Sequence, residues 1–392
     1  MAEIFLTIFF ISVLLFFLGS GIWVALSMIG VSAIGMMLFT SRPVGDAMAT
    51  TIWGTASSWT LTALPLFVWM GEILFRTKLS ENLFKGLSPW MQKLPGGLIH
   101  VNVVGCALFA AISGSSAATV ATVGKMSIPE LRKRNYPEKI LLGSLAGSGT
   151  LGLLIPPSII LIIYGVAVQE SIAKLFIAGI IPGIMIALIF MSYVIIWSLI
   201  NKKEMPKILE EYSFLEKIKR SKQLLPVILL ISAVIGSIYT GVATATEAAS
   251  LGVVGALILS YFQKSLTLET FKSSLLGATK TSCMIAFILA GSTFLSLAMG
   301  FTGLPRNLAI WIQGMELSPY VLILVLMIFY IILGMFLDGI SAVVLTMAII
   351  EPMIRQAGFD MIWFGIFLVI VVEMAQITPP VGLPKTEGTK SN

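Results

Sequence analysis

The most informative stretch of this chain is Gly149-Thr150-Leu151-Gly152-Leu153-Leu154-Ile155-Pro156-Pro157-Ser158. It interrupts an apolar stretch, 140–168, that is long enough to cross a bilayer. Proline lacks a backbone N–H and breaks the helical hydrogen-bond ladder, so a helix must come apart at Pro156-Pro157. The freed carbonyls can ligate a cation, and the N-terminus of the next helix offers its positive dipole to an anion. A simple kink is the alternative.

The composition of the chain places this break inside a membrane. Of the 392 residues, 57% are hydrophobic and 11% are charged, whereas an ordinary soluble domain has about 25% charged residues. The mean hydropathy is +0.99. These values exclude a soluble enzyme, a disordered protein and a nucleic-acid binder. We expect the N-terminus to form the first span rather than a cleaved signal peptide. The two cysteines, Cys106 and Cys283, are predicted to be buried apolar residues.

Nine apolar stretches predict an all-α polytopic membrane protein embedded in the lipid bilayer. They are 4–39, 61–75, 98–124, 140–168, 172–200, 224–262, 281–300, 319–350 and 361–381. Glycine-containing interruptions at 19–21 and 239–241 predict that the first and the sixth stretch each form two short helices. Four segments between the stretches are amphipathic or polar, and we expect them to lie along the membrane surface. These segments are 41–60, 76–97, 264–280 and 301–318.

The loop charges predict the orientation of the spans. Segments 76–93, 125–139 and 202–222 each carry a net charge of +3, and segment 264–280 carries +2. Cytoplasmic loops are enriched in Lys and Arg, so these four segments are predicted to be cytoplasmic. The segments with a net charge of zero or −1 are predicted to lie outside. These are 41–60, 168–174, 301–318 and 351–360.

This orientation turns two apolar stretches into re-entrant hairpins. Stretch 98–124 has cytoplasmic segments on both sides, so it must enter the membrane and return to the same face. Its predicted tip is Ser113-Gly114-Ser115-Ser116-Ala117-Ala118-Thr119. Stretch 319–350 has segments predicted to lie outside at both of its ends, so it must enter the membrane and return to the outer face. Its predicted tip is 334–341. Irregular backbone at membrane depth is tolerated where it is buried in protein or lines a cavity, so two such tips predict a central site.

The two halves of the chain match at a shift of 223 residues. Pro129 falls on Pro352, Ser115 falls on Asp338, and Pro156-Pro157 falls on Pro379-Pro380. The loop charges give the two copies opposite orientations. An inverted-topology repeat of this kind, with two hairpins and two broken helices, is typical of secondary transporters, whose ion sites lie at discontinuous helices.

Five motifs occur in a fixed order along nearly the whole chain, to about residue 383. They are Ala63-Leu64-Pro65-Leu66-Phe67, the first hairpin tip 113–119, the break 149–158, Thr246-Glu247-Ala248-Ala249 and Thr378-Pro379-Pro380-Val381-Gly382. In these residues the sequence resembles the large, DctM-like membrane subunit of tripartite ATP-independent periplasmic (TRAP) transporters.

The resemblance implies a sodium-driven importer of the elevator type in the bacterial inner membrane. Its expected partners are a small four-helix membrane subunit and a periplasmic substrate-binding protein, and its substrate would be an organic anion, such as a carboxylate or an acidic sugar. Sodium would be the coupling ion, with no organic cofactor and no catalytic residues.

The resemblance also implies two sodium sites and one substrate site. The first sodium site would lie between the hairpin tip 113–119 and the break 149–158, with Ser113, Ser115, Ser116, Gly149, Thr150, Gly152 and Pro156. The second would lie between the hairpin tip 334–341 and the break 377–380, with Gly334, Asp338, Gly339, Thr378 and Pro379. Substrate would bind between the two tips, at Ser116, Thr119, Asp338 and Ser341.

We expect the segments to form a static scaffold and a moving transport domain. The predicted order is scaffold helices at 1–60, a first transport repeat at 61–171, scaffold helices at 172–280 with a cytoplasmic loop at 201–223, a second transport repeat at 281–383 and a polar tail at 384–392. The tail cannot span a membrane. The second repeat is therefore expected to lack counterparts of the half-helix after Pro157 and of helix 172–200.

Four acidic residues lie inside the apolar stretches, where carboxylates are costly and function is the first hypothesis. Asp338 is predicted to line the site, with local capping of the hairpin tip as the alternative. For Glu247 we expect helix capping, and for Glu72 an i,i+4 ion pair with Arg76. The role of Glu373 stays open between the site and a contact between helices. The single histidine, His100, is predicted to form an interfacial hydrogen bond.

Two other classes of function remain as alternatives. A membrane-embedded enzyme acting on lipid would need a cluster of His, Asp or Glu at one depth, which one histidine and scattered carboxylates do not favour. A channel is compatible with two re-entrant hairpins, but hydroxyl-rich tips that face broken helices fit occluded binding better. No GxxxxGK[ST] run is present, which argues against an ATP-driven pump.

Overall fold

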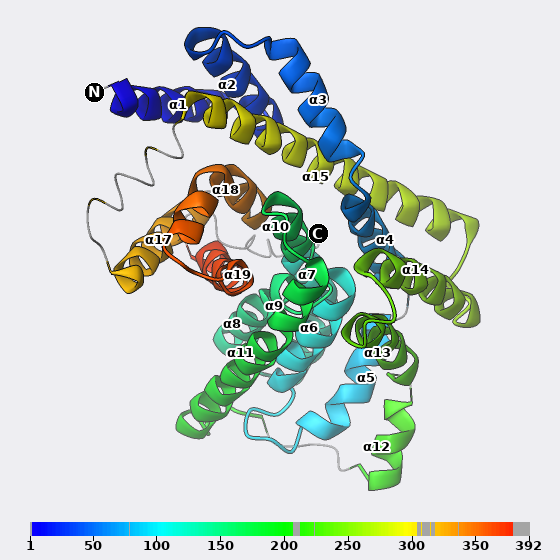
Figure 1. Cartoon of the computed structure of the whole chain (residues 1–392). Helices are drawn as coiled ribbons and strands as arrows, with labels where there is room; N and C mark the ends of the chain where they lie inside the picture. Colours follow the sequence, from blue (N-terminus) through cyan, green and yellow to red (C-terminus); the bar gives the residue numbers. More distant parts are fainter. Residues whose placement is uncertain are drawn as a thin grey trace. The chain divides into compact units, whose positions relative to one another are not determined.

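The computed structural model describes residues 2–77, 79–206, 212–222, 224–303, 307, 314, 318–335 and 337–378 (Figure 1). In these ranges all regular structure is helical and no strand occurs, which confirms the all-α prediction there. Four helices in the described ranges are long and apolar enough to cross a membrane, and up to seven spans result if each bent helix pair is one span.

The chain forms two compact units, and each is built from separate parts of the sequence. We call residues 2–62, 162–171 and 281–378 unit 1, and residues 63–161 and 172–280 unit 2. Unit 2 joins most of the predicted first transport repeat to predicted scaffold helices. Compactness does not show which part moves, so the division into scaffold and transport domain stays a prediction.

Unit 1 contains the N-terminal helices and the second predicted hairpin. Its helices are α1 (Ala2–Gly19), α2 (Val24–Phe39), α3 (Val44–Ala56), the short η1 (Trp59–Thr62), α17 (Pro319–Gly334), α18 (Gly339–Gln356) and α19 (Met361–Ile377). The predicted helix pair before residue 40 is confirmed as α1 and α2. The buried Tyr164 hydroxyl donates to the Met361 carbonyl at 2.6 Å, and its ring faces Gly365, so the start of α19 is fixed in this core.

Unit 2 contains the first predicted hairpin and the broken helix. Its helices are α4 (Ala63–Phe75), α5 (Leu79–Met91), α6 (Ile99–Ser113), α7 (Ser116–Lys133), α8 (Glu138–Gly149), α9 (Leu151–Leu154), α11 (Ile172–Ile200), α12 (Phe214–Ser221), α13 (Leu225–Tyr239) and α14 (Ala245–Phe262). The second predicted helix pair is confirmed as α13 and α14. Helix α10 (Ile159–Ala167) begins in this unit and ends in unit 1.

One predicted boundary is wrong. We expected 264–280 to be a surface segment separate from the span 281–300, but both belong to α15 (Leu268–Thr302), an unbroken helix of 35 residues (Figure 1). Residues 268–302 contain no proline that would end the helix, and Glu269 in its first turn stabilises the start of α15. In the first half of the chain the corresponding stretch is broken, because α3 ends at Ala56 and a separate short helix, η1, begins at Trp59.

Helices α7 and α18 both run beyond the apolar stretches that predicted them. Helix α7 continues nine residues past 124, to Lys133, and α18 continues six residues past 350, to Gln356. Basic residues in the last turn, Arg132 with Lys133 in α7 and Arg355 in α18, interact favourably with the negative helix C-terminus. The predicted polar connections are therefore mostly helical. Most of segment 301–318 lies outside the described residues.

Helix positions in the two halves agree with the predicted shift. Helices α7 and α18 both have 18 residues, and they begin at residues 116 and 339, which are 223 apart. Helices α8 and α19 begin at residues 138 and 361, again 223 apart. Between each pair, Asn135 and Gly358 both adopt a positive φ. The opposite membrane orientation of the two copies stays a prediction.

Candidate functional site

Helices α6 and α7 form a helical hairpin whose turn is two residues long. Helix α6 ends at Gly114, which adopts φ +58°, a conformation that favours glycine. Helix α7 then begins, because the Ser115 side chain caps it by accepting from the Ala118 N–H at 3.5 Å. The predicted helix–turn–helix at 98–124 is confirmed, while its entry into a membrane from one face stays a prediction.

The hydroxyl groups of the first tip are bonded to one another. The Ser113 hydroxyl oxygen lies 2.9 Å from the Thr119 hydroxyl oxygen and 3.2 Å from the Ser115 carbonyl oxygen. The buried Thr119 hydroxyl also donates to the Ser115 carbonyl at 2.8 Å. The tip is therefore a small polar cluster at the end of two mainly apolar helices.

The helix after α8 comes apart where the double proline predicts. Helix α8 ends at Gly149, α9 is a single turn, Ile155 is extended, and α10 begins at Ile159. The buried Ser158 hydroxyl donates to the Leu153 carbonyl, so one carbonyl at the break is satisfied by a side chain.

The hairpin tip and the broken helix touch through their backbones. A Cβ added to Gly152 would lie 2.7 Å from the Ser116 nitrogen, so only glycine allows this approach. The Ser116 hydroxyl donates to the Thr150 carbonyl at 3.3 Å, and both residues are buried. The Ile159 N–H donates to the Gly114 carbonyl at 3.4 Å.

The structure therefore brings together four of the residues predicted for the first ion site, Ser115, Ser116, Thr150 and Gly152. Gly149 packs against Val120 of α7, and the carbonyl of Pro157, which follows Pro156, lies beside Gly114. The Thr150 hydroxyl donates to the Gly147 carbonyl at 2.7 Å, which leaves its lone pairs for a cation. Cation binding itself stays a prediction.

The second hairpin shares one feature with the first, a side chain that caps the N-terminus of its second helix. Asp338 caps α18, and its carboxylate accepts from the Ser341 N–H at 3.1 Å. Gly334, at the end of α17, packs against Ala375 of α19. Thr378 ends α19 and donates to the Ala375 carbonyl at 2.6 Å. Gly339 is the first residue of α18. Pro379, the double proline and the tail lie outside the described residues.

In the structure one carboxylate oxygen of Asp338 caps α18. The other carboxylate oxygen can still accept a hydrogen bond or bind a cation. The predicted second ion site stays a prediction. The two hairpin tips belong to different units, so the substrate site at Ser116, Thr119, Asp338 and Ser341 stays a prediction too.

Several residues outside the site have the predicted roles. Glu72 forms an ion pair with Arg76. Glu247 completes a capping box with Thr244, whose N–H donates to the carboxylate at 2.8 Å. His100 is buried, and its Nε2 lies 2.8 Å from the Pro95 carbonyl. Glu373 is buried in α19, and its role stays open.

The prediction for the cysteines is half right. Cys106 is buried, but Cys283 is exposed on α15. An apolar residue on a helix that crosses a membrane can face lipid, so its hydrophobicity does not require burial in protein.

One contact that connects the first hairpin to α8 was not predicted from the sequence. The buried Asn102 of α6 donates to the Ser144 hydroxyl at 3.0 Å and to the Leu141 carbonyl at 3.3 Å. The sequence did contain a signal for this contact, because Asn102 is a lone amide in an apolar stretch. Such side chains form hydrogen bonds between helices in membranes. At the base of the hairpin, Tyr136 accepts from the Leu98 N–H at 3.0 Å. Burial raises the pKa of this hydroxyl, while that hydrogen bond and the charge of Arg134 lower it.

The long apolar helices, the helical hairpins and the broken helix define a multi-pass membrane protein. The chain matches the family described as "Tripartite ATP-independent periplasmic transporter, DctM component" over residues 9–385, and it belongs to this family. The match confirms the resemblance found in the sequence. The family is one of transporter permeases of bacterial membranes.

Relatives in the family transport different anions according to their names. The C4-dicarboxylate TRAP transporter large permease DctM of Pseudomonas aeruginosa is 34% identical, over 90% of this chain and 82% of its own length. The 2,3-diketo-L-gulonate permease YiaN of Escherichia coli is 32% identical over 86% of this chain and 78% of its own. The sialic acid permease SiaM of Vibrio cholerae is 31% identical over 93% of this chain and 84% of its own.

A solved structure shares the fold. MtrF of Neisseria gonorrhoeae, from a class of antimetabolite efflux pumps, matches 85% of this chain and 74% of its own with a TM-score of 0.51. The two chains are 13% identical, so this likeness concerns the fold alone.

Proposed function

We propose that this chain is the membrane permease subunit of a sodium-coupled, binding-protein-dependent importer of an organic anion in the bacterial inner membrane. The observation that carries the proposal is the backbone contact of the hairpin tip with the broken helix, at Gly152 and Ser116. Discontinuous helices at mid-membrane offer carbonyl oxygens to sodium and helix N-termini to anions in secondary transporters.

The chemistry of the tip suits sodium rather than a transition metal. The groups that meet there are hydroxyl and carbonyl oxygens of Ser113, Ser115, Ser116, Thr119 and Thr150. Hard cations prefer such oxygen ligands. The described residues contain no group of three His, Cys, Asp or Glu side chains that could hold a metal ion.

The proposed substrate is a carboxylate or an acidic sugar. Helix α7 begins at the first tip, where the neutral Ser115 side chain caps it, and its N-terminus favours negative charge. The named relatives act on dicarboxylates, diketogulonate and sialic acid, all of which are anions. The proposed partners are a small membrane subunit and a periplasmic binding protein, and movement of one unit carrying the substrate would complete an elevator cycle.

Uptake into proteoliposomes tests this function. The chain, reconstituted with its small subunit and a cognate binding protein, should accumulate a labelled organic anion only when sodium is higher outside. Saturable uptake distinguishes a transporter from a channel. Equal uptake with potassium in place of sodium would disprove sodium coupling.

Two substitutions test the first ion site. Ser115→Ala and Thr150→Val each remove one candidate oxygen ligand, so the sodium concentration for half-maximal uptake should rise severalfold with normal expression. The matched controls are Ser192→Ala and Thr279→Val. Like the Thr150 hydroxyl, these two hydroxyls donate to a carbonyl one turn earlier in their own helix, at 2.8 Å in both cases, but they lie on exposed surfaces. If the dependence of uptake on sodium concentration is unchanged in Ser115→Ala and Thr150→Val, neither hydroxyl is a sodium ligand.

A further inference from the structure

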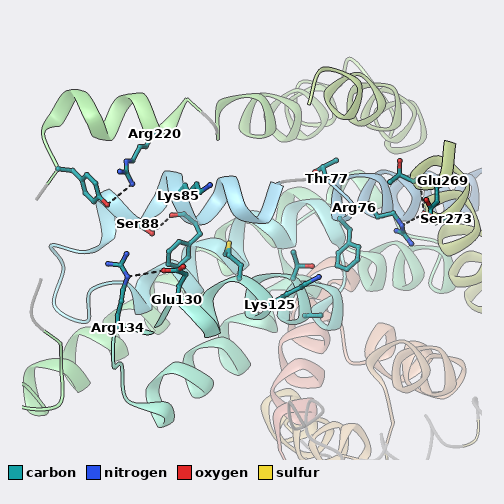
Figure 2. Close-up of a pocket in the computed structure, with 17 residues that line it drawn as sticks. Arg76, Thr77, Lys85, Ser88, Lys125, Glu130, Arg134, Arg220, Glu269 and Ser273 are labelled. Atoms are coloured by element: carbon teal, nitrogen blue, oxygen red, sulfur yellow. Dashed lines mark hydrogen bonds and ion pairs between the residues drawn. The ribbon is translucent and has the colours of Figure 1, made fainter. Parts of the chain in front are cut away.

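Unit 2 contains a cavity of 970 Å³ that the proposed transport site does not use. Its walls come from four separate stretches, 75–88, 121–134, 212–220 and 269–273 (Figure 2). These stretches fall almost entirely in the four segments whose net positive charge predicts a cytoplasmic location. Their meeting at one cavity supports that prediction, because segments on opposite membrane faces could not line it together.

The cavity has an excess of positive charge. Five basic side chains line it, Arg76, Lys85, Lys125, Arg134 and Arg220, against two acidic ones, Glu130 and Glu269. In Figure 2, Arg134 and Glu130 lie toward one end, and Arg76 and Ser273 lie toward the other. Arg76 is held by Glu72 and by Ser273, whose hydroxyl lies 3.1 Å from its Nε, so one positive charge at that end is partly neutralised.

Two groups in the wall have no hydrogen-bond or ion-pair partner among the residues that the structure describes. Lys125 is exposed and makes no ion pair or hydrogen bond with any described residue. Thr122, one turn before it on α7, is 5% exposed, and its hydroxyl has no hydrogen-bond partner in the described part of the chain. A buried hydroxyl without a partner is costly and needs an explanation. A bound oxyanion beside Thr122 and Lys125 would accept from both.

The surroundings of the cavity are those of a membrane surface. Helix α12 contributes Arg220 to the wall and exposes three apolar side chains, Phe214, Leu215 and Ile218. Its other residues are mostly basic, as in helices that lie in the lipid headgroup region. Trp90 of α5 donates to the Ser221 hydroxyl at 2.8 Å, which holds α12 beside the cavity. Inside, Phe75, Phe84 and Met126 offer apolar wall for the start of an acyl chain.

We propose that this cavity binds the phosphate of an anionic phospholipid headgroup from the cytoplasmic leaflet, with Lys125 and Thr122 as its central contacts. Basic pockets between helices on the cytoplasmic side are known to take such headgroups. The lipid phosphate rather than a soluble phosphate is favoured by the exposed apolar face of α12. Binding needs no transport, so its test is independent of the proposed function.

Native mass spectrometry of the detergent-purified full chain tests the proposal. Phosphatidylglycerol, phosphatidylcholine and inorganic phosphate are titrated separately. Phosphatidylglycerol should bind more tightly than phosphatidylcholine, and Lys125→Gln should weaken it about fivefold, as expected for one basic group at a membrane surface. Thr122→Val should also weaken binding, whereas Thr122→Ser, which keeps the hydroxyl, should not.

Lys139→Gln is the matched control. Lys139 is exposed in the same charged segment, 125–139, but does not line the cavity, so its loss should leave binding unchanged. Equal losses in the Lys125 and Lys139 variants would show general surface attraction and overturn the proposal. Equal binding of the two lipids would overturn it too. Binding of inorganic phosphate, sensitive to Lys125→Gln, without binding of phosphatidylglycerol would assign the cavity to a soluble anion instead.

Discussion

Among single residues, two glycines allow the backbone of the first hairpin tip to approach the broken helix closely. Gly114 supplies a positive φ, and Gly152 lets α9 approach the Ser115–Ser116 backbone. Sequence alone predicted both residues as part of a tip and a break. It could not predict that they touch, because that contact depends on the packing of α7 against α9.

Substitution of Gly152 by alanine should separate the tip from the broken helix. The new Cβ would lie 2.7 to 2.8 Å from backbone atoms of Ser115 and Ser116, which cannot rotate away. We expect a loss of about 1–3 kcal/mol of stability, typical of overpacking, and loss of sodium-driven uptake. Gly143→Ala on the neighbouring α8 is the control, since a Cβ there meets nothing within 4 Å. Thermal unfolding in detergent compares the two, and equal midpoints would contradict the expectation.

Two substitutions of Asp338 separate helix capping from cation binding. Asparagine caps helices about as well as aspartate, whereas alanine costs about 1 kcal/mol. Asp338→Asn should therefore keep the unfolding midpoint but raise the sodium concentration for half-maximal uptake, and Asp338→Ala should change both. Asp360→Asn is the control, because Asp360 caps α19 in the same way, at 2.8 Å from the Trp363 N–H. A normal sodium curve in Asp338→Asn would leave Asp338 with the capping role alone.

At the scale of elements, the sequence predicted where helices break better than where they continue. Proline, glycine and hydroxyl residues are local signals, so the turn at Gly114 and the break at Pro156-Pro157 were visible. The continuity of α15 was not visible, because polar residues such as Lys272 and Lys280 look like a surface segment when tertiary contacts are unknown. In the structure Ser274 accepts from Trp69 of α4 at 3.3 Å, so the polar part of α15 packs against another helix.

Labelling can test whether both ends of the α6–α7 hairpin lie on the cytoplasmic side. Lys93→Cys and Lys125→Cys, each in a Cys283→Ala background, place exposed thiols beyond α5 and on α7. Neither should react with a membrane-impermeant maleimide in intact cells, and both should react after permeabilisation. Asp46→Cys, in a segment predicted to lie outside, should react in intact cells. Reaction of either test position before permeabilisation would disprove the re-entrant hairpin.

At the scale of the whole molecule, each unit depends on helices from both halves of the chain. In unit 2, Gly252 of α14 packs against Met70 of α4, and in unit 1, Gly291 of α15 packs against the Ala25 carbonyl of α2. The sequence predicted a repeat but not this exchange of helices. Hydrophobicity identifies apolar faces without identifying their partners.

Fragments of the chain should therefore fold only together. A fragment of residues 1–206 and a fragment of residues 212–392 should each be degraded when expressed alone, because neither completes a unit. Coexpressed, they should copurify and resist mild proteolysis. The intact chain with a protease site placed after residue 206 is the control. A stable single fragment would show that one half folds independently.

The division of unit 1 into distant segments also sets an order of events during synthesis. Residues 2–62 pack in unit 1 with residues from 281 onward, which are synthesised about 220 residues later. At ordinary translation rates this delay is roughly 10 to 40 s. Through that interval α1, α2 and α3 meet lipid before their final neighbours exist. The buried Ser32 hydroxyl of α2 needs no later neighbour, because it donates to the Met28 carbonyl of its own helix at 2.5 Å. A polar group satisfied within its own helix can enter a bilayer early without needing a partner from the rest of the chain.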